Sequence, residues 1–394
     1  MPRYLQVSAQ KCHLTNRISI SRFSIFWFSV SGMRFSFSGG RCSQCCPLFL
    51  SALFWLLVAL FLTTYFKSRP VGMARSARLA TTLASKIKND DFWLNGDKRH
   101  LYAIHPTDLG AEAKPRDRAD MNRIVEHFIE LYDDDATKQF IEDSVDQADS
   151  VLTQMWHSLA KSFLSFFYTQ TDINGLLARG SMFVFSKEQF RYLVDKAGVS
   201  KAPISQEFKL GDALMDLGAG DGAPTQQLST FFSQTDVTET SWSMRNILTR
   251  KGFNVLEVES WTDNRTEFYD MISCLNLLDR CERPATVLSQ VRGALKPGGL
   301  LLVALVLPFR PFVEFGASRK PVEALPIAGE TFESQAVSVV KFFESEHFRL
   351  MSWTRVPYLC EGDLAQSVYV LDDGLFLFSK TEPSSEESQQ KDST

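Results

Sequence analysis

The sequence predicts an α/β fold of the Rossmann-like type, in which a doubly wound, mostly parallel sheet of seven strands follows an N-terminal helical extension. Three observations predict it. Apolar runs of strand length alternate with helical stretches over residues 210–380, the pattern of sheets whose parallel strands are joined by helices. One apolar run ends at Asp216 in a turn with three glycines. A second glycine turn, at Gly298 and Gly299, leads into another apolar run.

Composition limits the class of protein. The 394 residues are 44% hydrophobic and 22% charged, which is ordinary for globular domains and leaves room for one or two of them. Because the net charge is only -4, the chain has no global positive field, and we expect no nucleic acid partner. Seven cysteines are too few to staple a chain of this length with disulfides, and the sequence predicts no metal site.

The N-terminal region contains a basic stretch and then an apolar one. Residues 1–47 form a basic leader, and no Asp or Glu occurs before Asp90. Residues 48–66 carry no charge, and about 20 apolar residues suffice to cross a bilayer, so we predict a transmembrane or signal-anchor segment and membrane association through it. Cations are denser after it than before it, which favours a cytosolic location for the rest of the chain. Two alternatives stay open: a cleaved targeting segment, or translation that starts at Met73.

The next elements lead to the sheet. Residues 67–120 are polar and interrupted by Gly and Pro, which predicts a linker. Residues 121–178 are expected to form a helical extension, because apolar side chains recur there at spacings of three and four: Val145, Ala148, Leu152, Met155, Leu159, Phe163 and Phe166. This face is expected to pack on the following domain or to cover a substrate groove. Residues 179–380 make up the α/β domain, and residues 381–394 form a disordered tail.

The glycine turn carries the first chemical motif. In the stretch 214–222 a short strand ends at Asp216, and Gly218, Gly220 and Gly222 follow at a spacing of two, with Asp221 among them. Glycine lets the backbone turn sharply and approach a ligand closely. The pattern D-x-G-x-G-x-G resembles motif I of the class I S-adenosylmethionine-dependent methyltransferases. This resemblance implies S-adenosyl-L-methionine as the cofactor.

Later strands supply further candidates for binding this cofactor. Glu239 ends the next strand-like run, 239 - 216 = 23 residues after Asp216, close to the ~20 expected for an acid that accepts hydrogen bonds from ribose hydroxyls. Trp261 ends the third strand, where the adenine edge is expected. Arg179 is a candidate for gripping the cofactor carboxylate, with a structural ion pair as the alternative.

Five stretches resemble a narrower family. They are GLLARGSMFVFS (175–186), LMDLGAGDG (214–222), SCLNLLDRCERP (273–284), LVALVLPFRPFVE (302–314) and RVPYLCEGD (355–363). Together they closely resemble the DREV (methyltransferase-like protein 9) family over roughly residues 121–380. The resemblance implies a protein-histidine methyltransferase that modifies the N1 (pros) nitrogen in His-x-His stretches of target proteins.

The residues after the fourth strand suit such a reaction. A neutral imidazole needs a group that binds its second N–H and so fixes the tautomer, and a carboxylate fills this role. We predict Asp279 for it, with Asn276 as an acceptor or cofactor ligand and Tyr358 as a hydroxyl and ring wall. The alternatives are that Asp279 caps the following helix, that Asn276 bonds only backbone or cofactor, and that Tyr358 belongs to the core.

Two other functions remain open at this point. One is a methyltransferase for a small molecule or lipid at a membrane, and the other is a cofactor-binding pseudoenzyme scaffold. We expect an intracellular, membrane-associated protein, with the endoplasmic reticulum favoured and the mitochondrion as the alternative.

Overall fold

A computed structural model describes residues 73–104, 115–165, 168–177, 179–199, 209–313 and 319–382. The chain divides at Met73, and the second unit, Ala74–Thr394, contains the described fold. The predicted membrane segment 48–66 and nearly all of the predicted tail lie outside the described residues. Within the described ranges, no helix combines the length and the apolar composition that crossing a membrane requires.

An eight-stranded sheet organises this unit. Its strand order is β1-β7-β8-β6-β5-β2-β3-β4. Five neighbouring strands pair in parallel, with the last of them in chain order being β6 and the edge strand being β4: β2 (Gly211–Leu217), β3 (Phe232–Thr238), β4 (Asn254–Leu256), β5 (Tyr269–Leu275) and β6 (Leu295–Val306). The strands β7 (Phe348–Glu361) and β8 (Val368–Lys380) form an antiparallel hairpin, whose second strand pairs antiparallel with β6. The predicted doubly wound α/β fold is confirmed. One more strand is present than predicted, because β1 (Met182–Phe183) adds to the edge of β7.

Helices cover both faces of the sheet. On one face α11 (Pro284–Ala294) and α12 (Phe332–Ser345) pack on the strands, and on the other α8 (Lys187–Lys196) and α9 (Ala223–Ser229) do so. Each face of the sheet has its own hydrophobic core, and alternate side chains of β6 enter each of them. Leu301, Val303 and Leu305 lie in the core under α11 and α12, and Leu300, Leu302 and Ala304 lie in the core under α8 and α9. A strand buried on both sides is therefore a continuous apolar run. Helix α10 (Trp242–Arg250) joins β3 to β4.

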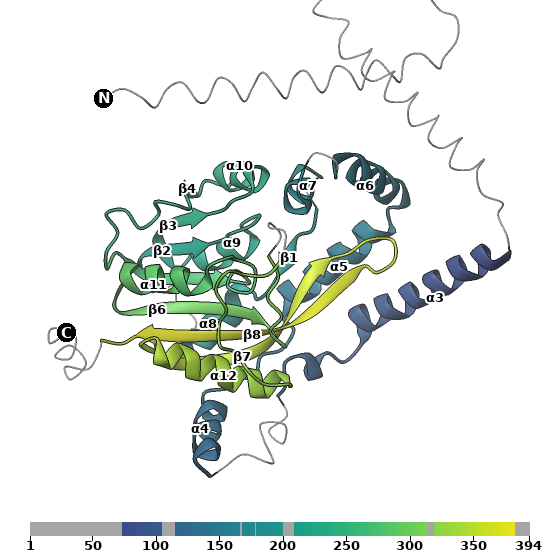
Figure 1. Ribbon diagram of the computed structural model, residues 1–394. Helices are drawn as coiled ribbons and strands as arrows, with labels where there is room; N and C mark the ends of the chain where they lie inside the picture. The colour runs from purple at the N-terminus through teal and green to yellow at the C-terminus, as the bar shows by residue number, and fades with distance from the viewer. Residues whose placement is uncertain are drawn as a thin grey trace, which may run out of the picture. The chain divides into compact units, whose positions relative to one another are not determined.

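The segment before the sheet is largely helical. Its elements are α3 (Met73–Asn95), the short 3-10 helix η2 (Arg99–Leu101), α4 (Pro115–Glu126), α5 (Asp135–Asp149), α6 (Val151–Leu164) and α7 (Gln170–Leu177). Helices thus occupy much of the range 67–120 that we expected to be a linker. Trp93 of α3 is buried in a small core with Ile141 of α5 and Leu359 of β7, beside the hairpin seen in Figure 1.

The apolar face expected across residues 145–166 does not act as one surface. Ser150 ends α5, and α6 begins at Val151. Val145 and Ala148 are buried, whereas Leu152 and Met155 of α6 are exposed. The periodic face is therefore divided between two helices, and it is buried at the end of α5 and exposed at the start of α6.

Candidate active site

The glycine turn after β2 has the backbone that its sequence predicts. Gly218, Gly220 and Gly222 have φ angles of +72°, +57° and +78°, in the left-handed region that favours glycine. A Cβ built on Gly220 meets no atom within 4 Å, so open space faces this residue. The turn ends at Gly222, the N-cap of α9. This arrangement leaves room for a ligand to approach the backbone.

Glu239 fastens this turn to the next strand. It follows β3 and is 8% exposed. Its Oε2 accepts from the Gly220 N–H at 2.9 Å, and its Oε1 accepts from the N–H groups of Thr240 and Ser241 at 2.7 and 2.8 Å. The Thr240 hydroxyl also donates to Oε1, at 3.3 Å, so Oε1 has its full set of donors. Among the described residues Oε2 accepts only the Gly220 N–H, and a carboxylate oxygen has about two acceptor positions. Oε2 of Glu239 therefore keeps capacity for a further donor beside the glycine turn, which fits a ribose hydroxyl.

The other predicted cofactor residues near the turn make contacts within the protein. Asp216 is buried within β2 and accepts from the hydroxyls of Thr225 (2.6 Å) and Ser273 (2.7 Å). Burial raises the pKa of this carboxyl to about 6. Asp221 accepts from the Ala223 N–H at 2.9 Å and from the Ser181 hydroxyl at 3.4 Å. Trp261 is 3% exposed and packs in the core near the Tyr269 ring. In this structure Asp216 contacts α9 and β5.

Arg179 lies in a network that joins α6 to the β7–β8 turn. Its Nε donates to Glu361 Oε1 at 3.0 Å, and its guanidinium also donates to the Gln154 side chain and the Gly362 carbonyl. The other oxygen of Glu361 accepts from the N–H groups of Gly180 and Ser181. The structure thus shows the ion-pair alternative for Arg179.

The acceptor candidates gather at the carboxyl end of β5. Leu277 connects them to the glycine turn, because a Cβ on Gly218 would come within 2.9 Å of its Cδ1. Asn276, with φ +54°, donates from its amide nitrogen to Asp373 at 2.8 Å. The helix α11 begins only at Pro284, with Arg283 as N-cap, so Asp279 does not cap it. Tyr358 of β7 is buried, and its hydroxyl donates to the sulfur of Met182.

Three buried oxygens in this group have no hydrogen-bond partner within the described residues: Oδ1 of Asn276, of Asp279 and of Asp373. Arg280 is the nearest cation to Asp279, at the loose distance of 3.5 Å. Burial raises the pKa of both carboxyls, well above the usual range for Asp373. Unpaired buried acceptors are costly, and a bound ligand that donates N–H groups would satisfy them.

Sequence reasoning missed Asp373. It is fully buried, it lies in β8 and it holds the amide of Asn276. A sequence indication existed, because Asp372 and Asp373 interrupt an otherwise apolar strand. A charged residue in such a run is unfavourable unless something nearby uses it.

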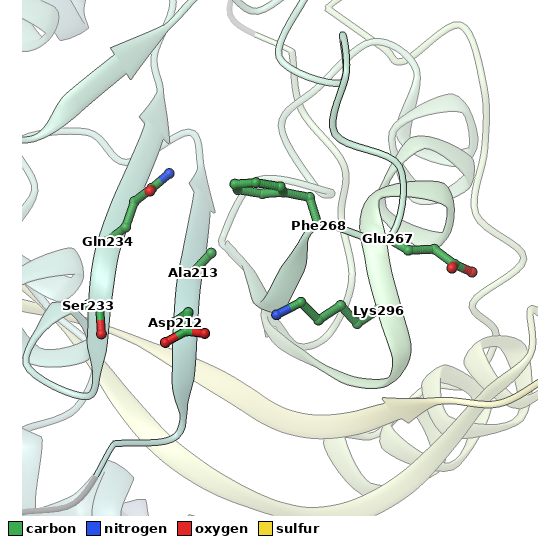
Figure 2. Close-up of a pocket in the computed structure, with 7 residues that line it drawn as sticks. All are labelled: Asp212, Ala213, Ser233, Gln234, Glu267, Phe268 and Lys296. Carbon is green, nitrogen blue, oxygen red and sulfur yellow. The ribbon is translucent and has the colours of Figure 1, made fainter.

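A pocket of about 560 Å³ opens beside these residues. Asp279 and Arg280 line it together with the end of β6 and residues of β8. A second pocket, of about 440 Å³, lies at the amino ends of the strands. It is lined by the first residues of β2 and β3 and by Phe268 and Lys296 (Figure 2). In open α/β sheets ligands bind beyond the carboxyl ends of the strands, which favours the first pocket as the site. Within the described ranges, no three His, Cys, Asp or Glu side chains are grouped to hold a metal ion.

A family model described as DREV methyltransferase matches residues 116–380 and so confirms the resemblance predicted from the sequence. The N-methyltransferase NodS from Bradyrhizobium japonicum WM9, solved with S-adenosyl-L-homocysteine, is 16% identical, with 43% of this chain and 79% of that chain covered and a TM-score of 0.29. The YcgJ protein of Bacillus subtilis is 12% identical, with coverages of 45% and 95% and a TM-score of 0.32.

Proposed function

Because this chain belongs to the DREV methyltransferase family, we propose that it is a protein-histidine N-methyltransferase, which forms N1 (pros)-methylhistidine in His-x-His stretches of target proteins. Membership of this family supports the general activity, S-adenosylmethionine-dependent methyl transfer. The proposal concerns the acceptor, and it is supported by the chemistry around Asp279.

The cofactor side of the site fits S-adenosylmethionine. Bound there, this cofactor supplies an electrophilic methyl group on a sulfonium. The open backbone at Gly220 and the free acceptor capacity of Glu239 would hold it. Asp216, Asp221 and Arg179 would act at one remove, because their side chains hold the elements that form the glycine turn and its surroundings.

The observation that carries the acceptor proposal is the unpartnered Oδ1 of Asp279. A neutral imidazole has one N–H donor and, on the other nitrogen, one lone pair. If Asp279 accepts the N–H of the tele nitrogen, the lone pair of the pros nitrogen is left as the nucleophile. The same carboxylate stabilises the positive charge that the ring gains on methylation. Positioning of this kind supplies most of the acceleration in a transfer that needs no strong base.

Asn276 and Asp373 complete this support. Asp373 accepts from the amide nitrogen of Asn276, which leaves the Asn276 carbonyl oxygen for a second donor. Two fixed acceptors, Asp279 and Asn276, suit a flat ring and the peptide N–H groups around it.

The rate at different pH values tests the nature of the acceptor. With the full chain and a His-Ala-His peptide, turnover should rise between about pH 5.5 and 7.5, because the imidazole must lose its proton, and should then level off. The matched peptide with lysine in place of both histidines should give only background. Robust lysine methylation, or a rate with the histidine peptide still climbing at about pH 9.5, would contradict the histidine assignment.

A further inference from the structure

The edge of β8 is open next to the candidate site. Strand β6 pairs with β8 from Leu300↔Ser379 to Val306↔Asp373, and the Leu307 N–H adds one more bond to the Asp372 carbonyl, at 2.9 Å. The next residue, Pro308, has no N–H and cannot continue the ladder. The pairing of β8 with β7 continues to Glu361↔Val368. Residues 368–371 therefore have a strand on one side only, among the residues that the structure describes.

Two contacts show which residues of β8 face this edge. The Asp372 carbonyl points away from β7, because it accepts from the Leu307 N–H. The residue opposite Asp372 in β7 is Pro357, which has no N–H to donate to Asp372. The Glu361 N–H donates to the Ser181 carbonyl on the far side of β7, so the pair Glu361↔Val368 is not hydrogen-bonded either. Antiparallel pairs alternate between bonded and non-bonded.

By that alternation Val368, Val370 and Asp372 direct their backbone N–H and C=O groups to the open edge. The Val368 carbonyl is already occupied by the side-chain amide of Gln366, at 2.7 Å. The N–H and C=O of Val370 remain. One residue of an added antiparallel strand could exchange two backbone hydrogen bonds with them.

This open edge forms a wall of the pocket that contains Asp279. The 560 Å³ space is lined both by β8 and by the chain that leaves β6: Val370, Leu371 and Asp372 come from β8, and Pro308, Arg310 and Phe312 come from that chain. Leu371 is 41% exposed. A chain paired with Val370 would run through this space to Asp279.

We propose that the target protein docks as an extended strand on the edge of β8 at Val370, which delivers its histidine to Asp279. The inference rests on the proposed function and deepens it by naming the form of the substrate. Adding a strand to an open sheet edge is a general mode of peptide recognition, with backbone bonds giving affinity.

The spacing of the expected motif agrees with this form. In a strand, residues two apart point to the same side and lie about 6.6 Å apart along the chain. Both histidines of a His-x-His stretch would thus face the site, and the residue between them would face away. In a helix the same two side chains would diverge.

A pair of variants tests the edge on the protein side. Val370→Pro removes the outward N–H, and the β7–β8 ladder does not use that group; Val370→Thr keeps it. The KM for a synthetic His-Ala-His peptide should be at least about tenfold higher for Val370→Pro than for Val370→Thr, because one backbone bond is lost and a peptide carbonyl is left unpaired. Binding of S-adenosyl-L-homocysteine should be equal in the two.

A scan of the peptide tests the same edge without altering the protein. Backbone N-methylation at successive residues should weaken turnover at every second position and spare the positions between, because only alternate N–H groups of an added strand face β8. Equal KM values for the two variants together with no alternation in the scan would overturn the proposal while leaving histidine methylation intact. If the unaltered enzyme does not methylate the peptide on histidine, the proposed function is wrong, and the docking proposal that rests on it is wrong as well.

Discussion

Asp279 is the side chain on which the proposed chemistry depends most. We expect Asp279→Asn to lower kcat by about 10²-fold or more, because the N–H of the acceptor ring loses its carboxylate. Affinity for S-adenosyl-L-homocysteine and the melting temperature should hold, since Asp279 Oδ1 has no hydrogen-bond partner among the residues that the structure describes and Arg280 lies 3.5 Å from the other oxygen.

Glu282→Gln is the matched control for this variant. It changes the same charge three residues further along, where the side chain is exposed. Turnover should stay near that of the unaltered enzyme. An Asp279→Asn protein that melts early but turns over normally in the cold would assign Asp279 a structural role instead.

The buried Asp216 carboxyl should make the free energy of unfolding depend on pH. Burial raises its folded pKa from 3.8 to about 6, so the folded state binds the proton more tightly than the unfolded state. The stability contributed by this carboxyl is fully present below about pH 4 and is lost as the pH rises to about 6. Relative to Asp216→Asn, the unaltered chain should therefore lose about 1 kcal/mol of unfolding free energy between pH 5 and pH 7. Denaturant unfolding at both pH values checks this, and a difference that does not change with pH refutes it.

At the scale of the elements, the glycine turn offers a sharp test of the cofactor site. A side chain at Gly218 would collide with Leu277, whereas a side chain at Gly220 would enter open space. Gly220→Arg should abolish binding of S-adenosyl-L-homocysteine by filling that space, at a folding cost of about 1–2 kcal/mol for the left-handed backbone. Gly252 has φ +86° and equally open surroundings, between α10 and β4.

Gly252→Arg therefore carries the same backbone penalty outside the glycine turn. It should bind S-adenosyl-L-homocysteine as the unaltered chain does, and calorimetry compares the two variants directly. Unchanged binding by Gly220→Arg would remove the cofactor from this turn.

The network of Arg179 and Glu361 joins α6 to the β7–β8 hairpin. Both side chains are largely buried, at 13% and 4% exposure. Breaking such a pair by removing one partner costs about 3–5 kcal/mol. Arg179→Ala and Glu361→Ala should destabilise the fold by similar amounts, and the double variant should be little worse than either. A large loss of cofactor affinity in Arg179→Ala without a loss of stability would instead place Arg179 at the cofactor carboxylate.

At the scale of the whole molecule, local pattern predicted the sheet well. The apolar run of β6 and the glycines after β2 are specified by neighbours in sequence, and the structure has them where the pattern placed them. The break between α5 and α6 was missed, because a periodic apolar face continues through Ser150 in the sequence while the packing does not.

The candidate site could be predicted only in part, for a related reason. Asn276 and Asp279 stand in a recognisable stretch after β5, but Asp373 lies 97 residues beyond Asn276 and reaches it only through the pairing of β6 with β8. The ion pair of Arg179 likewise spans 182 residues. Partners this distant are set by sheet topology, which single-residue patterns do not encode.

Analysis of the methylated residue tests the histidine assignment most directly. The full chain is incubated with labelled S-adenosylmethionine and a His-Ala-His peptide, and the hydrolysed product is separated into its methylated amino acids. We expect label in pros-methylhistidine, which should be absent from the Ala-Ala-Ala peptide and strongly reduced with Asp279→Asn. Label in tele-methylhistidine would contradict the placement of the ring against Asp279, and a His-Ala-His peptide that takes up no label would contradict the histidine acceptor itself.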